Sequence, residues 1–460
     1  MDSSLLLLLV GGGSYPDQKG TVTKSVLPLA GRIAGFSEHG LHLVELTYLL
    51  GASVLIMLTA PLRRPWLVPV VAYGSYYAGA SWKELTQLEI LVSAPIYFCL
   101  WAGYRRDERS WVAWCSGVAV GVVAAFKLVL TPLPILLLLA AYRQFRQWRA
   151  IAGGVLTVLA PMTAWLLWSG GFEQYVWTTF IFPPQGIKAN GPLDGGVLLG
   201  SLGWFATHFA PWLLLGALAM PLLVRLRDRF LVVAAAWIAI GFALIGVQVL
   251  SWWPYHLELL MLPVALLAVA WLDRLPDRWA VAAVVVGLLS YAPIAIKKIR
   301  PLTAAAVLGD AEGGRQYRRA ISPEYRQAWN ETRFLAEPNT SSGPIYVLGN
   351  PLYIWLARRS QSPGIDGWGT NFHTPEQWRR FSVDLENKRP PYVFLDSSDE
   401  QYLPSRSTET LRVLANCYRV RSRSAQGAWF ESVALPPAAR PRTGGGWPFA
   451  GSAPSHQSSQ

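Results

Sequence analysis

The chain has 460 residues, of which 52% are hydrophobic and only 15% are charged. A soluble protein carries about a quarter charged residues, so the composition excludes an ordinary soluble protein. The net charge of +12 comes from short basic clusters between apolar runs, which excludes nucleic acid as the partner and is typical of membrane proteins. The three cysteines, Cys99, Cys115 and Cys417, lie far apart and predict neither a disulfide framework nor a metal site.

Residues 1–40 form the first predicted region, an outer loop with an interfacial helix. The apolar run 5–10 is too short for a signal sequence and has no basic residue before it. Apolar residues recur at helical spacing over 21–36, with Lys24 and Arg32 among them. This pattern predicts an amphipathic helix on the outer membrane interface, with a soluble linker helix as the alternative.

Residues 41–300 are predicted to be a bundle of about ten transmembrane helices, because apolar runs of nearly membrane-spanning length recur there. The fold class is therefore mostly α, a polytopic helix bundle in the cell (plasma) membrane. The predicted spans are 41–60, 66–82, 87–104, 111–126, 128–142, 150–170, 211–225, 230–250, 255–272 and 279–296. The two spans within 111–142 are expected to form a hairpin broken near Lys127 and Pro132.

Loops between these spans alternate in charge. The basic loops contain Arg63 and Arg64; Arg105, Arg106 and Arg109; Arg143, Arg146 and Arg149; Arg225, Arg227 and Arg229; and Arg274 and Arg278. Arginine and lysine favour cytoplasmic loops, so this side is predicted to be cytoplasmic. Both the N-terminus and the C-terminal domain are then extracytoplasmic.

After residue 300 the long apolar runs stop, and residues 301–435 are predicted to be a small extracytoplasmic α/β domain. Short apolar segments at 344–348 and 391–395 predict buried strands, and 351–357 and 375–387 predict helices between them. Segments 403–415 and 429–433 continue the alternation. The tail, 436–460, is rich in proline, glycine and serine, which predicts disorder.

Polar residues gather in the outer loops and are candidates for a site, because ionisable groups at membrane depth are costly. They are Tyr15, Asp17 and Lys19 near the N-terminus, Glu84, Lys127, Gln185 and Lys188, and Tyr255 and His256 with Glu258. The group around Asp17 is by itself more typical of a solvated turn, and the amine of Lys127 can extend to the lipid headgroups. The pair of His256 and Glu258 is harder to explain in this way. No nucleotide-binding, zinc-protease, serine-nucleophile or Cys-His motif occurs.

The order of these motifs resembles the GT-C type of integral-membrane glycosyltransferases, in particular bacterial proteins similar to dolichyl-phosphate-mannose-protein mannosyltransferases. The matching residues are Asp2, the glycines at 11–13, Tyr15, the segment 17–20, Glu84, Phe126 and Lys127, Tyr255 and His256, and the segment 345–349. The resemblance covers most of the chain. The sequence departs from the family's pattern in two places, since the first transmembrane span is absent and Thr21 stands where proline is usual.

The resemblance implies transfer of a sugar, with inversion, from a polyprenyl-phosphate-linked donor to a lipid, glycan or protein acceptor at the outer membrane face. Asp2 or Asp17, supported by Glu84, would deprotonate the acceptor hydroxyl. The donor phosphate would be held by Lys19, Lys127 and His256, or by a divalent cation such as Mg²⁺ or Mn²⁺ with ligands that the sequence does not define. Tyr15, Tyr255, Gln185 and Lys188 would belong to the substrate loops.

Two other classes of protein stay open at this point. A transporter or flippase would contain inverted repeats and polar residues near the middle of the membrane. The sequence has no convincing repeat, and its polar groups lie toward one face. A membrane scaffold without enzymatic activity, whose outer domain binds partners, is the third possibility.

Overall fold

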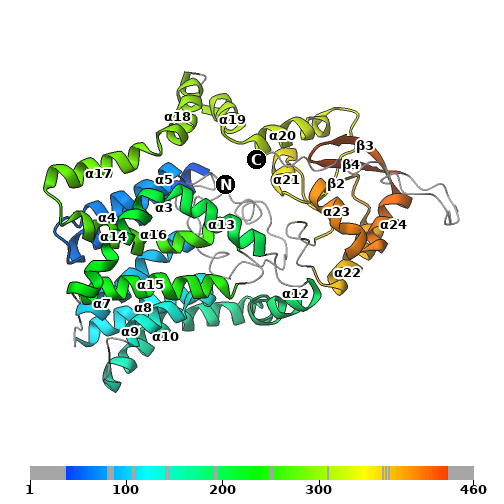
Figure 1. Cartoon of the computed structure of the whole chain (residues 1–460). Helices are drawn as coiled ribbons and strands as arrows, with labels where there is room; N and C mark the ends of the chain where they lie inside the picture. The colour runs from blue at the N-terminus through cyan, green and yellow to red at the C-terminus, as the bar shows by residue number, and fades with distance from the viewer. Residues whose placement is uncertain are drawn as a thin grey trace. The chain divides into compact units, whose positions relative to one another are not determined.

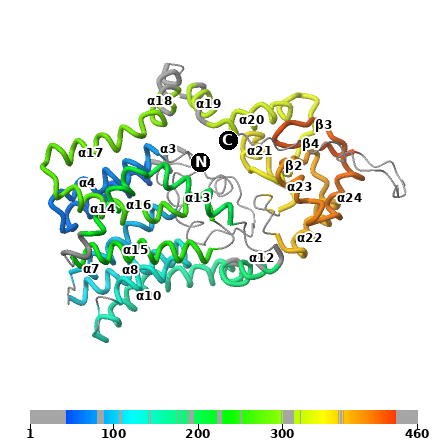
Figure 2. Tube along the Cα trace, viewed as in Figure 1, coloured from blue at the N-terminus to red at the C-terminus, as the bar shows by residue number. Residues whose placement is uncertain are grey.

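The computed structural model describes residues 38–79, 88–105, 109–139, 142, 144–190, 195–226, 228–248, 252–307, 310–364, 367, 370 and 373–433. The chain folds into two compact units that divide between Asn330 and Glu331 (Figures 1 and 2). The predicted interfacial helix at 21–36 and the predicted disordered tail at 436–460 lie outside the described residues.

The larger unit is helical. Its elements are α3 (Glu38–Thr59), α4 (Leu67–Pro69), the π-helix η1 (Val70–Gly74), α5 (Ser75–Gly79), α6 (Leu88–Leu91), α7 (Ser93–Arg105), α8 (Ser110–Lys127), the 3₁₀-helix η2 (Leu128–Leu130), α9 (Pro132–Leu139), α10 (Phe145–Trp168), α11 (Phe172–Val176), the π-helix η3 (Trp177–Ile181), α12 (Phe182–Asn190), α13 (Gly195–His208), α14 (Ala210–Leu226), α15 (Arg229–Gly246), the 3₁₀-helix η4 (Pro254–Leu260), α16 (Met261–Leu272), α17 (Asp277–Leu289), α18 (Ala292–Val307), α19 (Asp310–Ile321) and α20 (Pro323–Thr332). α8 ends at Lys127 and α9 begins at Pro132, the two positions at which the sequence predicted a break.

Four helical segments of the described chain are long and apolar enough to cross a membrane, namely 110–130, α10, α15 and 254–272. A fifth is added if α13 and α14, which meet at a bend of 87°, are counted as one broken span. The predicted span 66–82 falls on three short helices that follow one another directly, α4, η1 and α5. The predicted span 87–104 falls on α6 and α7, which Val92 separates. The structure therefore supports an integral membrane unit, whereas the number of ten spans stays a prediction.

α16 is the centre of this unit. Its sequence is apolar all round, and every residue from Met261 to Ala270 is buried. A helix that is hydrophobic on all faces is stable only when other helices surround it. α16 packs against α14, α15 and α4.

α8 and α10 pack together through glycine and lie side by side in Figures 1 and 2. A Cβ atom added to Gly117 would stand 1.9 Å from the carbonyl oxygen of Ile151. A Cβ atom added to Gly154 would stand 2.0 Å from the carbonyl oxygen of Trp114. The two backbones are therefore in direct contact, as in membrane helix pairs that associate through small residues.

Replacing Gly154 with Ala is expected to lower the free energy of unfolding by about 1–3 kcal/mol, because the two backbones must move apart to admit the methyl group. Gly153→Ala is the matched control, since the added Cβ would lie 3.8 Å from Trp114, an ordinary contact. Unfolding of the purified protein in a titration with SDS measures both variants. Equal stability of the two would contradict this packing.

The smaller unit contains a four-stranded sheet. Its strands are β1 (Ile345–Leu348), β2 (Tyr392–Asp396), β3 (Tyr418–Ser424) and β4 (Gly427–Ser432), and its helices are α21 (Leu352–Ala357), α22 (Pro375–Lys388), α23 (Ser397–Arg406) and α24 (Thr408–Cys417). The sheet order is β1-β2-β4-β3. β1 and β2 are parallel, and the other pairs are antiparallel. The unit begins at Glu331, near the end of α20.

Helices cover both faces of this sheet. Tyr346, Val393 and Phe430 face one side and form a core with α22, α23 and α24. The alternate residues face the other side, where Phe394 stacks on Tyr353 of α21 with ring centroids 4.0 Å apart. The expected α/β layers are therefore present. The sequence analysis missed α23 and the edge strand β3.

Candidate functional site

Lys127 and His256, predicted from the sequence as phosphate ligands, lie together at a third residue, Glu89. The Lys127 Nζ atom donates a hydrogen bond to Glu89 Oε1 and lies 3.2 Å from His256 Nδ1. His256 Nδ1 is 3.3 Å from the same Glu89 oxygen. In the sequence, Lys127 is 38 positions from Glu89 and 129 positions from His256. Only the fold brings the three residues together.

Three helix ends form this cluster, which we call the Glu89 cluster (Glu89, Lys127 and His256). Glu89 lies in the four-residue helix α6, Lys127 is the last residue of α8, and His256 lies in the first turn of η4. α8 has 18 residues, so Lys127 is separated from the arginine loop before α8 by about 27 Å along the helix axis. This is close to the thickness of the hydrocarbon layer. The cluster and the basic loop therefore lie at opposite ends of a helix that is long enough to span a membrane.

The Glu89 cluster is shielded from solvent. Glu89 is 2% exposed and His256 is 3% exposed, whereas the side chain of Lys127 is 19% exposed. A carboxylate and an ammonium in such surroundings are stable only if they are paired, because desolvating an isolated charge costs several kcal/mol. Lys127 is the most accessible member of the cluster.

Neighbouring residues hold His256 in place. The ring of Tyr255 stacks on it, with centroids 4.5 Å apart. The Ser201 hydroxyl of α13 donates to the carbonyl oxygen of Trp252 at 2.6 Å, which ties α13 to the segment that precedes η4. Glu258, in the same 3₁₀-helix, is fully buried. The predicted role of Tyr255 in a substrate loop is compatible with its place beside the cluster.

Of the remaining predicted site residues, the structure describes Gln185 and Lys188. Gln185 and Lys188 are exposed on α12, and among the described residues no hydrogen bond or ion pair joins them to the Glu89 cluster. Asp2, Tyr15, Asp17, Lys19 and Glu84 lie outside the described residues. Their predicted roles stay predictions.

Two buried acidic residues were missed by the sequence analysis. Glu89 lies within the predicted span 87–104, and Glu45 lies within the predicted span 41–60. Glu45 is 2% exposed and accepts a hydrogen bond of 2.8 Å from the Tyr76 hydroxyl. The signal that could have found both is an acidic side chain inside an apolar run, where its cost demands a partner.

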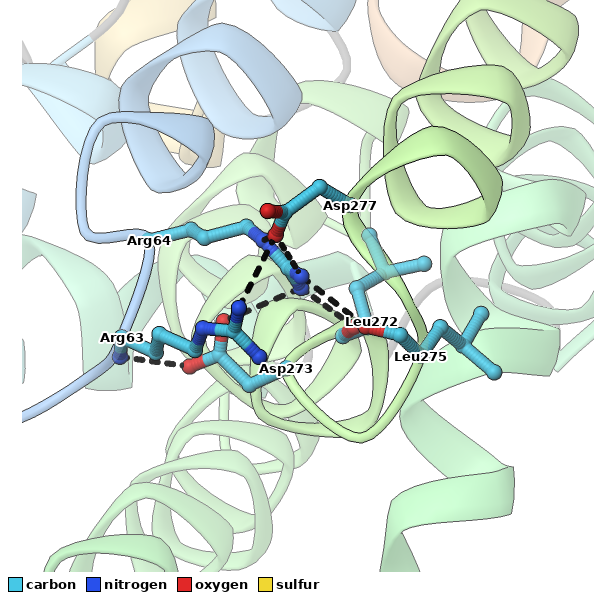
Figure 3. Close-up of polar contacts among 6 residues, drawn as sticks. All are labelled: Arg63, Arg64, Leu272, Asp273, Leu275 and Asp277. Carbon is cyan, nitrogen blue, oxygen red and sulfur yellow. Dashed lines mark hydrogen bonds and ion pairs between the residues drawn. The ribbon is translucent and has the colours of Figure 1, made fainter.

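A second polar centre lies at the other end of α16 (Figure 3). The buried guanidinium of Arg64 donates to the carbonyl oxygens of Leu272, at 2.7 Å, and Leu275, at 2.9 Å, and forms an ion pair with Asp277. The backbone N–H of Arg63 donates to Asp273 at 2.7 Å. These contacts join the loop that contains Arg63 and Arg64 to the loop after Leu272. Both loops were predicted from their arginines to lie on the same side of the membrane. We call this set the arginine clamp (Arg63, Arg64, Leu272, Asp273, Leu275 and Asp277).

Ionisation of the two aspartates in the arginine clamp is affected in opposite directions. The hydrogen bond from Arg64 lowers the pKa of Asp277 below its ordinary value. Burial raises the pKa of Asp273, against the effect of the Arg63 backbone and Arg64. Asp277 therefore keeps its negative charge more readily than Asp273 does, and its role in the arginine clamp is structural.

The smaller unit offers one further ionisable group near the carboxyl ends of the parallel strands. Burial raises the pKa of Asp399 to about 6, against the hydrogen bond that Thr370 donates to it. Within the described residues no group of three or more His, Cys, Asp or Glu side chains is placed to hold a metal ion.

The fold is similar to that of a GT-C glycosyltransferase, ArnT, as the sequence resemblance predicted. The solved structures that carry this likeness are those of ArnT from Cupriavidus metallidurans. The apo crystal structure matches 94% of this chain and 92% of ArnT with a TM-score of 0.61 and 15% identity. The crystal structure bound to undecaprenyl phosphate matches 91% and 88% with a TM-score of 0.58 and 15% identity. No protein-family profile and no curated relative matches the sequence.

Proposed function

We propose that this protein is a membrane glycosyltransferase that moves a sugar from a polyprenyl-phosphate-linked donor to an acceptor at the outer membrane face, with inversion. The observation that carries the proposal is the pairing of Lys127 with His256 at a helix end, on one buried oxygen of Glu89. The likeness to ArnT, which has been crystallised with undecaprenyl phosphate, supports a polyprenyl phosphate as the carrier.

The proposed chemistry divides into two tasks. The bond between the sugar and the phosphate breaks as negative charge develops on the leaving phosphate, and donors already aimed at that charge lower the barrier. Lys127 and His256 supply two such donors, and Lys19 is proposed to add a third. The acceptor hydroxyl must lose its proton as it attacks, which requires a carboxylate base. Asp17 or Asp2 is proposed for this role, with Glu84 in support.

The place of the Glu89 cluster also suits a lipid-linked donor. A polyprenyl chain stays among the helices while its phosphate lies at the membrane surface. Lys127 ends a helix of membrane-spanning length, at the end away from the basic loop. An ammonium at this depth neutralises a phosphate that enters from the lipid, and the acceptor can approach from the aqueous side.

Replacing Lys127 with Met is expected to weaken binding of undecaprenyl phosphate by about tenfold or more, because a charge-assisted hydrogen bond is lost. Binding to the purified full chain in detergent micelles measures the effect. Lys388→Met, at an exposed lysine of the smaller unit, is the matched control and should bind as the unchanged protein does. An unchanged affinity of the Lys127→Met protein would refute the phosphate site.

The same preparations test the enzyme class itself. Incubation with polyprenyl-phosphate sugars and membrane extracts as the acceptor source should release polyprenyl phosphate, detected by mass spectrometry. A transporter would move the lipid between leaflets of a vesicle and leave the bond between sugar and phosphate intact. That outcome would replace the proposed function.

A further inference from the structure

The two groups proposed to bind the donor phosphate are already engaged by a carboxylate. The Glu89 Oε1 atom accepts from Lys127 Nζ and lies 3.3 Å from His256 Nδ1. A carboxylate oxygen in contact with an ammonium and an imidazole resembles a phosphate oxygen in the same position, because both are negatively charged hydrogen-bond acceptors. Glu89 therefore occupies the position that a bound phosphate requires.

A phosphate and the Glu89 carboxylate repel each other when they share these donors. Like charges brought together in an interface cost several kcal/mol, and the low exposure of Glu89, 2%, leaves little water to screen them. A phosphate that binds Lys127 and His256 must therefore displace the carboxylate or bind while it is protonated. In either case phosphate binding is coupled to the loss of the contacts of Glu89.

The local structure allows such a displacement. Glu89 belongs to a helix of only four residues, Leu88–Leu91, which is separated from α7 at Val92. The Tyr48 hydroxyl donates to the carbonyl oxygen of Leu91 at 2.6 Å and fixes the end of this helix to α3. The backbone is thus anchored, so displacement of the carboxylate requires a change of side-chain rotamer at Glu89.

We propose that Glu89 is a resident counter-ion that takes the place of the donor phosphate in the free protein and returns to it when the product leaves. This inference rests on the proposed function. It assigns to Glu89 a regulatory role in the site. The carboxylate keeps Lys127 and His256 paired between turnovers, and its return helps to expel the polyprenyl phosphate that remains after sugar transfer. Binding of polyprenyl phosphate is weaker because of Glu89, and release is faster.

A role for Glu89 in orienting Lys127 and His256 predicts the opposite change in phosphate affinity. If Glu89 only oriented Lys127 and His256 for the phosphate, its removal would weaken phosphate binding. If Glu89 competes with the phosphate, its removal strengthens binding. Glu89→Gln keeps the shape of the side chain and removes the charge, so its affinity for undecaprenyl phosphate separates the two roles.

Undecaprenyl phosphate is titrated against the purified full chain in detergent micelles. We expect Glu89→Gln to bind it at least about fivefold more tightly than the unchanged protein. Glu89→Asp, which keeps the charge but shortens its reach, should fall between the two. Glu173→Gln, at an exposed acid of α11, is the control for removing one negative charge and should not change the affinity.

Kinetics provide a second measurement. Undecaprenyl phosphate added as product should inhibit sugar transfer by the Glu89→Gln protein at lower concentrations than it inhibits the unchanged protein. Unchanged or weaker binding by Glu89→Gln overturns the counter-ion role. If Glu89→Gln does not fold, the Asp variant still decides, because weaker binding by it would refute competition. Normal binding by Lys127→Met would instead refute the phosphate site, so the two failures are distinguishable.

Discussion

Replacing Asp17 with Asn is expected to reduce sugar transfer by at least about 10²-fold, the effect typical of losing a general base. Asn keeps the shape of the side chain and cannot take the proton of the acceptor hydroxyl. Binding of undecaprenyl phosphate should be retained, because the proposed phosphate ligands Lys127 and His256 are unchanged. Single-turnover transfer from a polyprenyl-phosphate sugar measures the rate, and a titration with undecaprenyl phosphate measures the binding.

The choice between the candidate carboxylates follows from the same assay. Asp384→Asn, in the smaller unit, controls for an unrelated change of charge. If the protein with both Asp2 and Asp17 replaced by Asn transfers sugar at the normal rate, neither is the base. Glu84 is then the next carboxylate to test, as the acid of a short predicted outer loop.

Replacing Arg64 with Leu is expected to lower the free energy of unfolding by about 3–5 kcal/mol, as happens when one partner of a buried ion pair is removed, because Arg64 forms such a pair with Asp273 at 3.6 Å. Arg64 is 5% exposed and serves two backbone carbonyl groups as well as Asp277. Leucine fills part of the space but leaves these acceptors without their donor. Thermal unfolding of the purified protein, followed by circular dichroism, measures the loss.

Arg63→Leu is the matched control for Arg64→Leu. The Arg63 side chain is 62% exposed and pairs with Asp277 at 3.2 Å, and exposed pairs contribute about 0–1 kcal/mol. The backbone N–H of Arg63, which binds Asp273, is retained in the variant. Equal losses for the two variants would show that burial of Arg64 does not determine the strength of the arginine clamp.

The sequence predicted Lys127 and His256 because each stands at the end of an apolar run, where a polar residue is conspicuous. It did not predict Glu89, because a linear pattern does not show which helix ends meet. The contact depends on α6, α8 and η4 converging. Breaks within apolar runs, such as the π-helix after Pro69, were also invisible in the composition, and they are why span lengths differ from the prediction.

In the smaller unit, too, some elements were predicted from the sequence and others were missed. The segments 344–348 and 391–395 were predicted as strands because they are apolar throughout, and both are buried strands of the sheet. β3 was missed because its sequence is largely polar, as suits an edge strand with exposed side chains. The helix α23 was missed because its start, Ser397, depends on the cap that Asp396 provides at the end of β2.

The charged edge of the sheet has a consequence for self-association. Arg419 and Arg421 pair with Glu431 of β4, and Arg423 pairs with Glu400 of α23. A second copy that added its own β3 to this edge would set one row of arginines against another, and the repulsion opposes such pairing. At the opposite edge, Ile345 of β1 is bridged to Gln361. The arginines of β3 and the bridge at Ile345 thus oppose extension of the sheet by a second copy of the protein.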